Sequence, residues 1–317
     1  MESTSLLKQL RIDLIDPNPD NPRIVFRQEE MDSLLISIKK YGVQVPISVF
    51  KEGNRFVLID GERRWRTSKK LNLPTIPAII QSKPSPLDNL LMMFNIHALR
   101  EQWDLFTIGN KITKVIDLLT NKLGHEPKES ELSEETGLSR GTIRRCRLLI
   151  ELPERFKKII LKELEKPKSK QKLTEDFFIE MESALKTVKR NYPEIIEDNL
   201  DDIRDNLIEK YQKGVIKNIV DFRKVSKLAT SPKNVDYPKD DAIKALSRIF
   251  EEENVGIDDV FNSTVSVLYD EKKLLSNFNN VLYYVQNLTE EEREDEDIQQ
   301  TLRALKEAIE KILDGQL

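Results

Sequence analysis

The chain has 317 residues, of which 33% are charged and 38% hydrophobic, and its mean hydropathy is −0.50. This length accommodates two or three domains with cores of their own. No apolar run approaches the roughly 20 residues that span a bilayer, and Met1–Leu10 lacks the apolar core of a signal peptide. We therefore expect a cytoplasmic protein without a membrane partner.

Cysteine and histidine are scarce, since the chain holds one cysteine, Cys146, and two histidines, His97 and His125. One thiol excludes disulfides within the chain and zinc sites built on several thiolates. Two imidazoles are also too few for a histidine-rich metal site. We expect no metal centre built on sulfur or imidazole.

The net charge of −4 hides a difference between the two parts of the chain. Residues 1–170 carry 30 Lys and Arg against 23 Asp and Glu, whereas residues 171–317 carry 21 against 32. The first part is basic and the second acidic, so a polyanion is expected to bind the first.

Short β-rich runs alternate with helical patterns between residues 11 and 80, which predicts a small α+β domain. The predicted strands are Arg11–Ile15, Ile47–Phe50, Arg55–Ile59 and Ile76–Ile80, and the predicted helices are Gln28–Tyr41 and Gly61–Leu71. Gly53-Asn54 lies between two of these strands and predicts a hairpin turn.

Helical periodicity follows Lys83–Pro86 and continues almost to the end of the chain. The basic run Lys166–Lys170 reads as a linker, so we place the main boundary near residues 165–172. The predicted domains are residues 1–100, 101–168 and 169–317, an α+β domain followed by two all-α regions.

Residues 131–149, ELSEETGLSRGTIRRCRLL, have the spacing of a helix-turn-helix. Leu132, Leu138 and Ile143 fall on the inner faces, Gly137 suits the left-handed turn, and Ser139 suits the N-cap of the second helix. The predicted DNA-binding residues are Ser139, Arg140, Thr142, Arg144 and Arg145. The alternative is an ordinary helical hairpin with a solvated basic face. Cys146 falls on the buried stripe and is expected to be a small core residue.

Residues 61–66, Gly-Glu-Arg-Arg-Trp-Arg, follow a predicted strand and open a helix. A glycine there lets backbone N–H groups approach an anion, the helix N-terminus favours negative charge, and guanidinium groups bind phosphate in a fork. The pattern predicts a triphosphate site; the alternative is a solvated charged helix.

Over roughly residues 10–165 the sequence resembles the ParB/Spo0J partition family. The ordered matches are Asn18-Pro19 with Asn21-Pro22-Arg23, Ser37-Ile38, Gly42-Val43, Pro46-Ile47, the motif at residues 61–66, and the helix-turn-helix. The resemblance implies a ParB/sulfiredoxin-like fold that binds CTP and closes a clamp on DNA. By position it implies that Gly61, Arg63 and Arg64 hold the phosphates, that Ser48 contacts the nucleotide, and that Glu62 assists hydrolysis by positioning water.

One family motif, Glu-Asn-x-x-Arg, departs from the pattern here. Asn95 is retained, Phe94 replaces the acidic residue, and Arg100 comes two residues late. Asn95 and Arg100 are still expected to bind nucleotide, but the sequence assigns no metal ligand and leaves Mg²⁺ open. We expect a nucleotide-binding switch, and the alternative is a weak, CTPase-like nucleoside triphosphatase. Trp103 is expected to anchor domain packing.

The predicted function is that of a nucleotide-controlled, ParB-like clamp or switch on double-stranded DNA, in plasmid or chromosome partition or related DNA regulation. Such a protein would be associated with the nucleoid or a plasmid. The alternative is a small-molecule kinase or another phosphoryl-transfer enzyme on the same fold. Sulfiredoxin activity needs a nucleophilic cysteine, and none precedes Cys146.

Residues 173–317 are helical and acidic. Leu275, Phe278, Leu282 and Val285 follow helical spacing, as does the stretch from Ile298 to Ile312, which predicts an antiparallel helical hairpin. Its function stays open between a homodimer contact, a binding site for another protein and a monomeric bundle.

Overall fold

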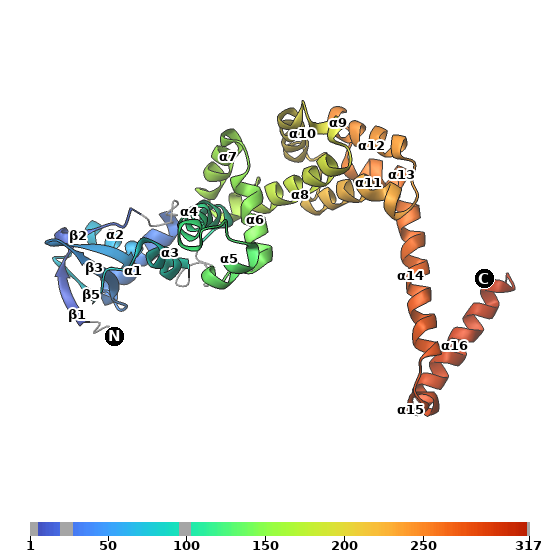
Figure 1. Ribbon diagram of the computed structural model, residues 1–317, viewed down its shortest axis with the longest axis horizontal. Coiled ribbons are helices and arrows are strands. Elements are labelled where there is room, and N and C mark those ends of the chain that lie inside the picture. The colour runs from blue at the N-terminus through green and yellow to red at the C-terminus, as the bar shows by residue number, and fades with distance from the viewer. Residues whose placement is uncertain (1–5, 20–27, 95–102, 316–317) are drawn as a thin grey trace. The chain divides into compact units, whose positions relative to one another are not determined.

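The computed structural model describes residues 6–19, 28–94 and 103–315, and it divides into two compact units, Met1–Ser226 and Lys227–Leu317 (Figure 1). The first unit starts with a mixed sheet and continues with helices, and the second unit is helical. The predicted fold class, α+β followed by all-α, is confirmed. The predicted boundaries after residues 100 and 168 fall inside the first unit and stay predictions.

One mixed sheet is formed by the described strands, in the order β1-β5-β3-β4-β2 (Figure 1). Pairs β1–β5 and β3–β4 are antiparallel, whereas β3–β5 and β2–β4 are parallel. The strands are β1 Leu6–Arg11, β2 Ile15–Asp16, β3 Ile47–Glu52, β4 Arg55–Asp60 and β5 Thr75–Gln81.

Three of the predicted strands are confirmed, and Gly53-Asn54 connects β3 to β4 as a hairpin. The predicted strand Arg11–Ile15 is wrong. Strand β1 ends at Arg11, a 3-10 turn occupies Ile12–Leu14, and β2 begins at Ile15. The turn separates two edge strands: β1 pairs with β5 at one edge of the sheet, and β2 pairs with β4 at the other edge.

Helices cover both faces of this sheet. Helix α2 (Glu62–Lys70) packs on one face through Trp65, whose indole nitrogen donates a hydrogen bond to the Ile12 carbonyl at 3.5 Å, and α1 (Gln28–Tyr41) packs beside α2. Helix α3 (Pro86–Met93) places Met92 against Phe50, Val57 and Ile59 on the opposite face. Because β3 alternates its side chains between the faces, Val49 and Phe50 enter different cores.

The helical part of the first unit follows residue 102. Its helices are α4 Leu105–Leu123, α5 Glu129–Thr136, α6 Arg140–Ile150, α7 Glu154–Leu164, α8 Glu175–Asn191, α9 Pro193–Ile196 and α10 Leu200–Gln212. Leu90 and Met93 of α3 share one apolar core with α4, α5 and α6. This core therefore joins the sheet domain to the helices.

Trp103 lies in that core and meets the ring of Phe94 edge-on, with 5.6 Å between the ring centres. Phe94 is completely buried and Trp103 nearly so. The prediction that Trp103 anchors domain packing is confirmed.

Glu175, the first residue of α8, caps the N-terminus of α4. Its carboxylate accepts a hydrogen bond from the Phe106 amide at 2.6 Å, beside Asp104, which is the N-cap of α4. Burial raises the pKa of Glu175 to about 7, and the nearby Asp104 carboxylate adds to the increase. Two carboxylates therefore compete for the positive end of one helix.

We expect the free energy of unfolding to fall as the pH rises from about 4.5 to 7. The folded state retains the Glu175 proton in this range and the unfolded state releases it. A unit of pKa corresponds to about 1.4 kcal/mol, so a shift from 4.5 to about 7 makes the loss at most about 3.5 kcal/mol. Glu175→Gln removes this loss, and its melting temperature is predicted to exceed that of the wild type more at pH 8 than at pH 5. Glu180→Gln on the same helix serves as the control; an equal response of both variants contradicts the assignment.

The C-terminal unit continues from α11 (Phe222–Asn234), which crosses the boundary between the units. Its further helices are α12 Lys239–Glu251, α13 Ile257–Thr264, α14 Ser266–Gln286, α15 Glu290–Glu294 and α16 Glu296–Leu313. The helical stretches predicted around Leu275–Val285 and Ile298–Ile312 are confirmed as α14 and α16. The apolar stripes that were predicted to pack as a hairpin are exposed, with Leu275 61% and Phe278 59% accessible. Among the described helices, none has the length and apolar character needed to cross a bilayer.

Candidate functional site

The first turn of α2 begins at Gly61, which has a φ of 94° in the left-handed region. A Cβ atom at this position would lie 2.6 Å from Ile47 Cγ2 and 2.8 Å from Arg64 Nη2. Glycine is therefore required twice, by the backbone conformation and by the close approach of β3 and the Arg64 guanidinium.

The two arginines of the motif are held by carboxylates of the same domain. Arg63 pairs with Glu30 of α1 at 3.1 Å, and Arg64 pairs with Asp60 at the end of β4 at 2.8 Å. Arg64 Nε is buried and has no hydrogen-bond partner in the described structure. A buried guanidinium nitrogen without a partner is a donor that a polar ligand can satisfy.

Glu62 and Ser48 lie at the same end of the sheet. Glu62 is buried and accepts a hydrogen bond from Arg66 at 2.7 Å, and Ser48 of β3 is paired with Asp60 of β4. Ser48, Gly61 and Arg64 thus lie near paired ends of β3 and β4, whereas Arg63 reaches Glu30 of α1. The predicted catalytic role of Glu62 stays a prediction.

Asn95 and Arg100 lie outside the described residues. Phe94, which takes the place of the family's acidic residue, points into the apolar core and offers no metal ligand. The described carboxylates around α2, Glu30, Asp60 and Glu62, are all paired with arginines. As long as they are paired with arginines, these carboxylates are not free to coordinate Mg²⁺, which prefers oxygen ligands.

A hollow of about 530 Å³ lies between α1 and α2. This volume is in the range of small-molecule pockets. Its wall combines cations with apolar surface, from Pro17, Gln28, Met31, Leu35, Trp65, Arg66, Thr67, Lys69 and Lys70. The sequence pattern does not predict this hollow, although three of its lining residues, Arg66, Lys69 and Lys70, form a basic cluster that is visible in the sequence.

Gly61→Ala is predicted to lower the melting temperature more than Gly53→Ala does. Both glycines have a positive φ, but a Cβ at Gly53 meets nothing within 4 Å, whereas at Gly61 it collides with Ile47. The backbone strain, of order 1 kcal/mol, is common to both variants, and only Gly61→Ala adds overpacking of about 1–3 kcal/mol. Thermal unfolding measures the difference; equal melting temperatures contradict the steric argument.

The helix-turn-helix consists of α5, Gly137 in the left-handed region, and α6. Ser139 caps α6 by accepting a hydrogen bond from the Thr142 amide at 3.0 Å, and Ser133 donates to the Leu138 carbonyl at 2.6 Å. Leu132, Leu138, Ile143 and Cys146 are buried in the shared core. The predicted motif geometry is confirmed.

Cys146 is a buried free thiol, as expected. Burial raises the pKa of its thiol to about 12, so the thiolate that a nucleophile requires is disfavoured.

The outer face of α6 exposes Arg140, Arg144 and Arg145, while Thr142 is half-buried. Arg144 pairs with Glu129 of α5 at 2.8 Å, and its guanidinium lowers the pKa of that carboxyl. Arg145 pairs with Asp176 of α8. Arg140 forms no ion pair with any residue that the structure describes.

The similarity to known proteins covers about half of the chain and includes the sheet domain. Residues 1–94 match the ParB N-terminal domain. The probable chromosome-partitioning protein ParB of Campylobacter jejuni is 35% identical over 152 residues, 48% of this chain and 52% of that protein. The nucleoid occlusion protein of Geobacillus kaustophilus is 30% identical over 157 residues, 49% of this chain and 53% of that protein. The chain therefore matches about half the length of these relatives.

Among solved structures, a pNOB8-like ParB N-domain aligns with a TM-score of 0.50 at 16% identity, covering 79% of this chain and all of that one. This likeness supports the fold alone. C-terminally truncated ParB from Caulobacter crescentus, solved with CTP-γ-S and with the centromeric parS site, gives TM-scores of 0.29 and 0.43 at 23% and 19% identity. Those alignments cover 56% and 70% of this chain and 92% and 98% of the solved ones. The matches therefore identify residues 1–94 as a ParB N-terminal domain, and about half of the chain is similar in sequence to chromosome-partitioning and nucleoid occlusion proteins.

Proposed function

We propose that the chain binds double-stranded DNA through α6 and that a nucleoside triphosphate bound at the start of α2 controls this binding. The observation that carries the proposal is the helix-turn-helix with its exposed arginines, which shares one core with α3 of the ParB domain. A change at the sheet domain can reach α6 through this core.

DNA binding follows from the chemistry of the outer face of α6. A recognition helix places its N-terminal residues in the major groove, and Ser139 with Arg140, Thr142 and Arg144 forms that end of α6. Arginine binds both phosphate oxygens and the guanine edge. The proposal assigns the interface to this face and leaves the target sequence open.

The double substitution Arg144→Ala/Arg145→Ala is predicted to weaken binding of the full chain to a mixed-sequence duplex. If both side chains contact phosphate, the slope of log affinity against log salt falls by about 2, because each contact releases close to one counterion. A gel-shift titration at several salt concentrations measures both effects.

Arg223→Ala is the matched control, since Arg223 is an exposed arginine of the same unit that pairs with Glu180 away from α6. Wild-type affinity and slope in the Arg144/Arg145 variant, or an equal loss in the control, contradict the assignment of α6.

We further propose that the nucleotide, CTP by family resemblance, binds at Gly61–Arg64 with Ser48 in contact. The glycine cradle, the positive end of α2 and the partnerless Nε of Arg64 support this site. The phosphates would take the place of Glu30 and Asp60 as partners of the arginines. Asn95 and Arg100 remain proposed ligands.

Calorimetry of the full chain with CTP, ATP, GTP and UTP is expected to show binding that Arg63→Ala abolishes and Cys146→Ala preserves. Because Phe94 stands in place of the family's acidic residue and is buried in the apolar core, phosphate release is expected to be slow or absent, so the nucleotide acts as a switch. Absence of binding by all four nucleotides contradicts the site. Rapid release that Glu62→Gln abolishes contradicts the switch and restores Glu62 as a catalytic residue.

The exposed apolar stripes of α14 and α16 support a proposed homodimer, because large exposed apolar patches mark association surfaces. Another protein that binds these helices is the alternative. Sedimentation equilibrium distinguishes the two, since a purified monomer at micromolar concentration contradicts the homodimer.

The cellular role that we propose is plasmid or chromosome partition, or a related regulation of DNA, in a protein associated with the nucleoid or a plasmid. The relatives named above are partition and nucleoid occlusion proteins. They favour this role over the small-molecule kinase.

A further inference from the structure

Helix α8 lies against the recognition helix α6 and holds one of its arginines. Asp176, in the first turn of α8, pairs with Arg145, and Lys186 pairs with Glu151 after the last residue of α6 at 3.8 Å. The carboxylate of Asp176 is thus placed beside the proposed DNA-binding face. Neither side chain is buried, since Arg145 is 47% and Asp176 56% exposed.

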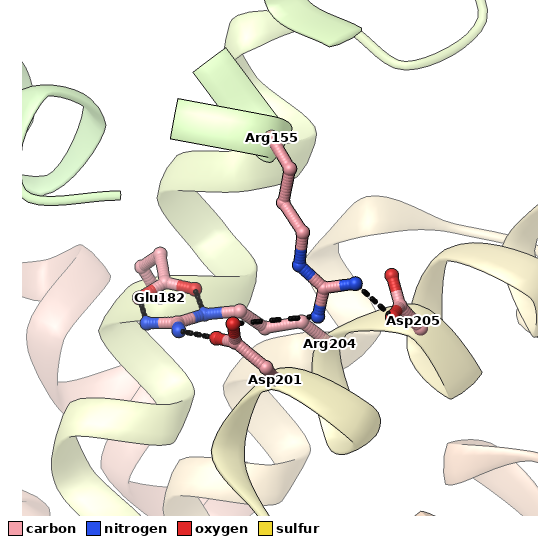
Figure 2. Close-up of polar contacts among 5 residues, drawn as sticks. All are labelled: Arg155, Glu182, Asp201, Arg204 and Asp205. Carbon is pink, nitrogen blue, oxygen red and sulfur yellow. Dashed lines mark hydrogen bonds and ion pairs between the residues drawn. The ribbon is translucent and has the colours of Figure 1, made fainter. Parts of the chain in front are cut away.

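Ion pairs join α8 to α10 and α10 to α7. Figure 2 shows Arg204 of α10 in a two-pronged ion pair with Glu182 of α8, with both distances 2.8 Å and both residues buried. Arg155 of α7 reaches α10 through Asp205 at 2.6 Å and Asp201 at 3.4 Å. Since breaking a buried pair is costly, α8 is held firmly against α10.

We propose that Asp176 limits the DNA affinity of this chain by competing with the DNA for Arg145. The inference rests on the proposed DNA binding by α6. In the free protein the Asp176 carboxylate accepts a hydrogen bond from Nη2 of Arg145, one of the donors that a phosphate or a guanine edge would use. DNA binding then exchanges one partner of Arg145 for another, and Asp176 is left beside a polyanion.

The expected change in DNA affinity is small because the Arg145–Asp176 pair is exposed to solvent. An exposed ion pair contributes little to stability, so losing its carboxylate leaves the fold intact and changes affinity by about two- to fivefold. Release of Arg145 also adds up to one counterion to the salt dependence. Arg144, whose partner Glu129 belongs to the motif itself, and Arg140, which has no ion pair with a described residue, do not depend on Asp176.

The experiment compares DNA binding of the full chain and its Asp176→Asn variant across a range of salt concentrations. We expect the variant to bind about two- to fivefold more tightly, with a steeper salt dependence. In the Arg145→Ala background the same substitution is expected to give no gain in affinity, because the arginine for which Asp176 and the DNA compete is no longer present.

Glu180→Gln is the matched control. It removes the same charge from α8 one turn further along, where the carboxylate pairs with Arg223. An equal gain from Glu180→Gln shows a general effect of net charge and overturns the proposal, as does a gain that persists with Arg145→Ala. Weaker binding by Asp176→Asn overturns it as well, since Asp176 would then orient Arg145 for DNA.

The two proposals fail in distinguishable ways. If Arg144→Ala weakens binding but Asp176→Asn does not tighten it, DNA binding by α6 stands and the competition is wrong. If neither Arg144→Ala nor Arg145→Ala changes binding, the proposed interface itself is wrong.

Discussion

Ion pairs between arginines and carboxylates of the same chain determine what both candidate sites can do. Arg63 and Arg64 at the start of α2 are paired with Glu30 and Asp60, and Arg144 and Arg145 on α6 are paired with Glu129 and Asp176. Each pair holds a guanidinium in place before a ligand arrives. In each pair, a phosphate that binds the guanidinium would compete with the carboxylate for its donors.

An exchange of carboxylate partners for phosphate partners would suit a nucleotide-controlled switch. Pairs near the surface are weak, so a nucleotide or a DNA backbone that brings several charges can replace them at small cost. The sheet domain and the recognition helix are connected by the core around Phe94 and Trp103. Phe94, which replaces the acidic residue of the family's Glu-Asn-x-x-Arg motif, therefore has a structural function here. It packs in the core that connects the sheet domain to α6.

Local signals in the sequence predict much of this structure. The hairpin at Gly53-Asn54, the helix Gln28–Tyr41 and the turn at Gly137 are correct because each depends on a few neighbouring residues. The strand Arg11–Ile15 is wrong because its end is set by long-range pairing, of β1 with β5 and of β2 with β4. The ion pairs of Arg63 and Arg145 could not be predicted, since their partners lie 33 and 31 residues away in sequence. The hollow between α1 and α2 likewise depends on how two helices pack.

The most direct test of the account is amide hydrogen exchange of the full chain, measured alone, with CTP, and with duplex DNA. The account predicts slower exchange in the first turn of α2 with CTP and in α6 with DNA, and smaller changes in α3 and α4, which share the core with α6. Protection by neither ligand at α2 and α6, or protection restricted to α14 and α16, would contradict it.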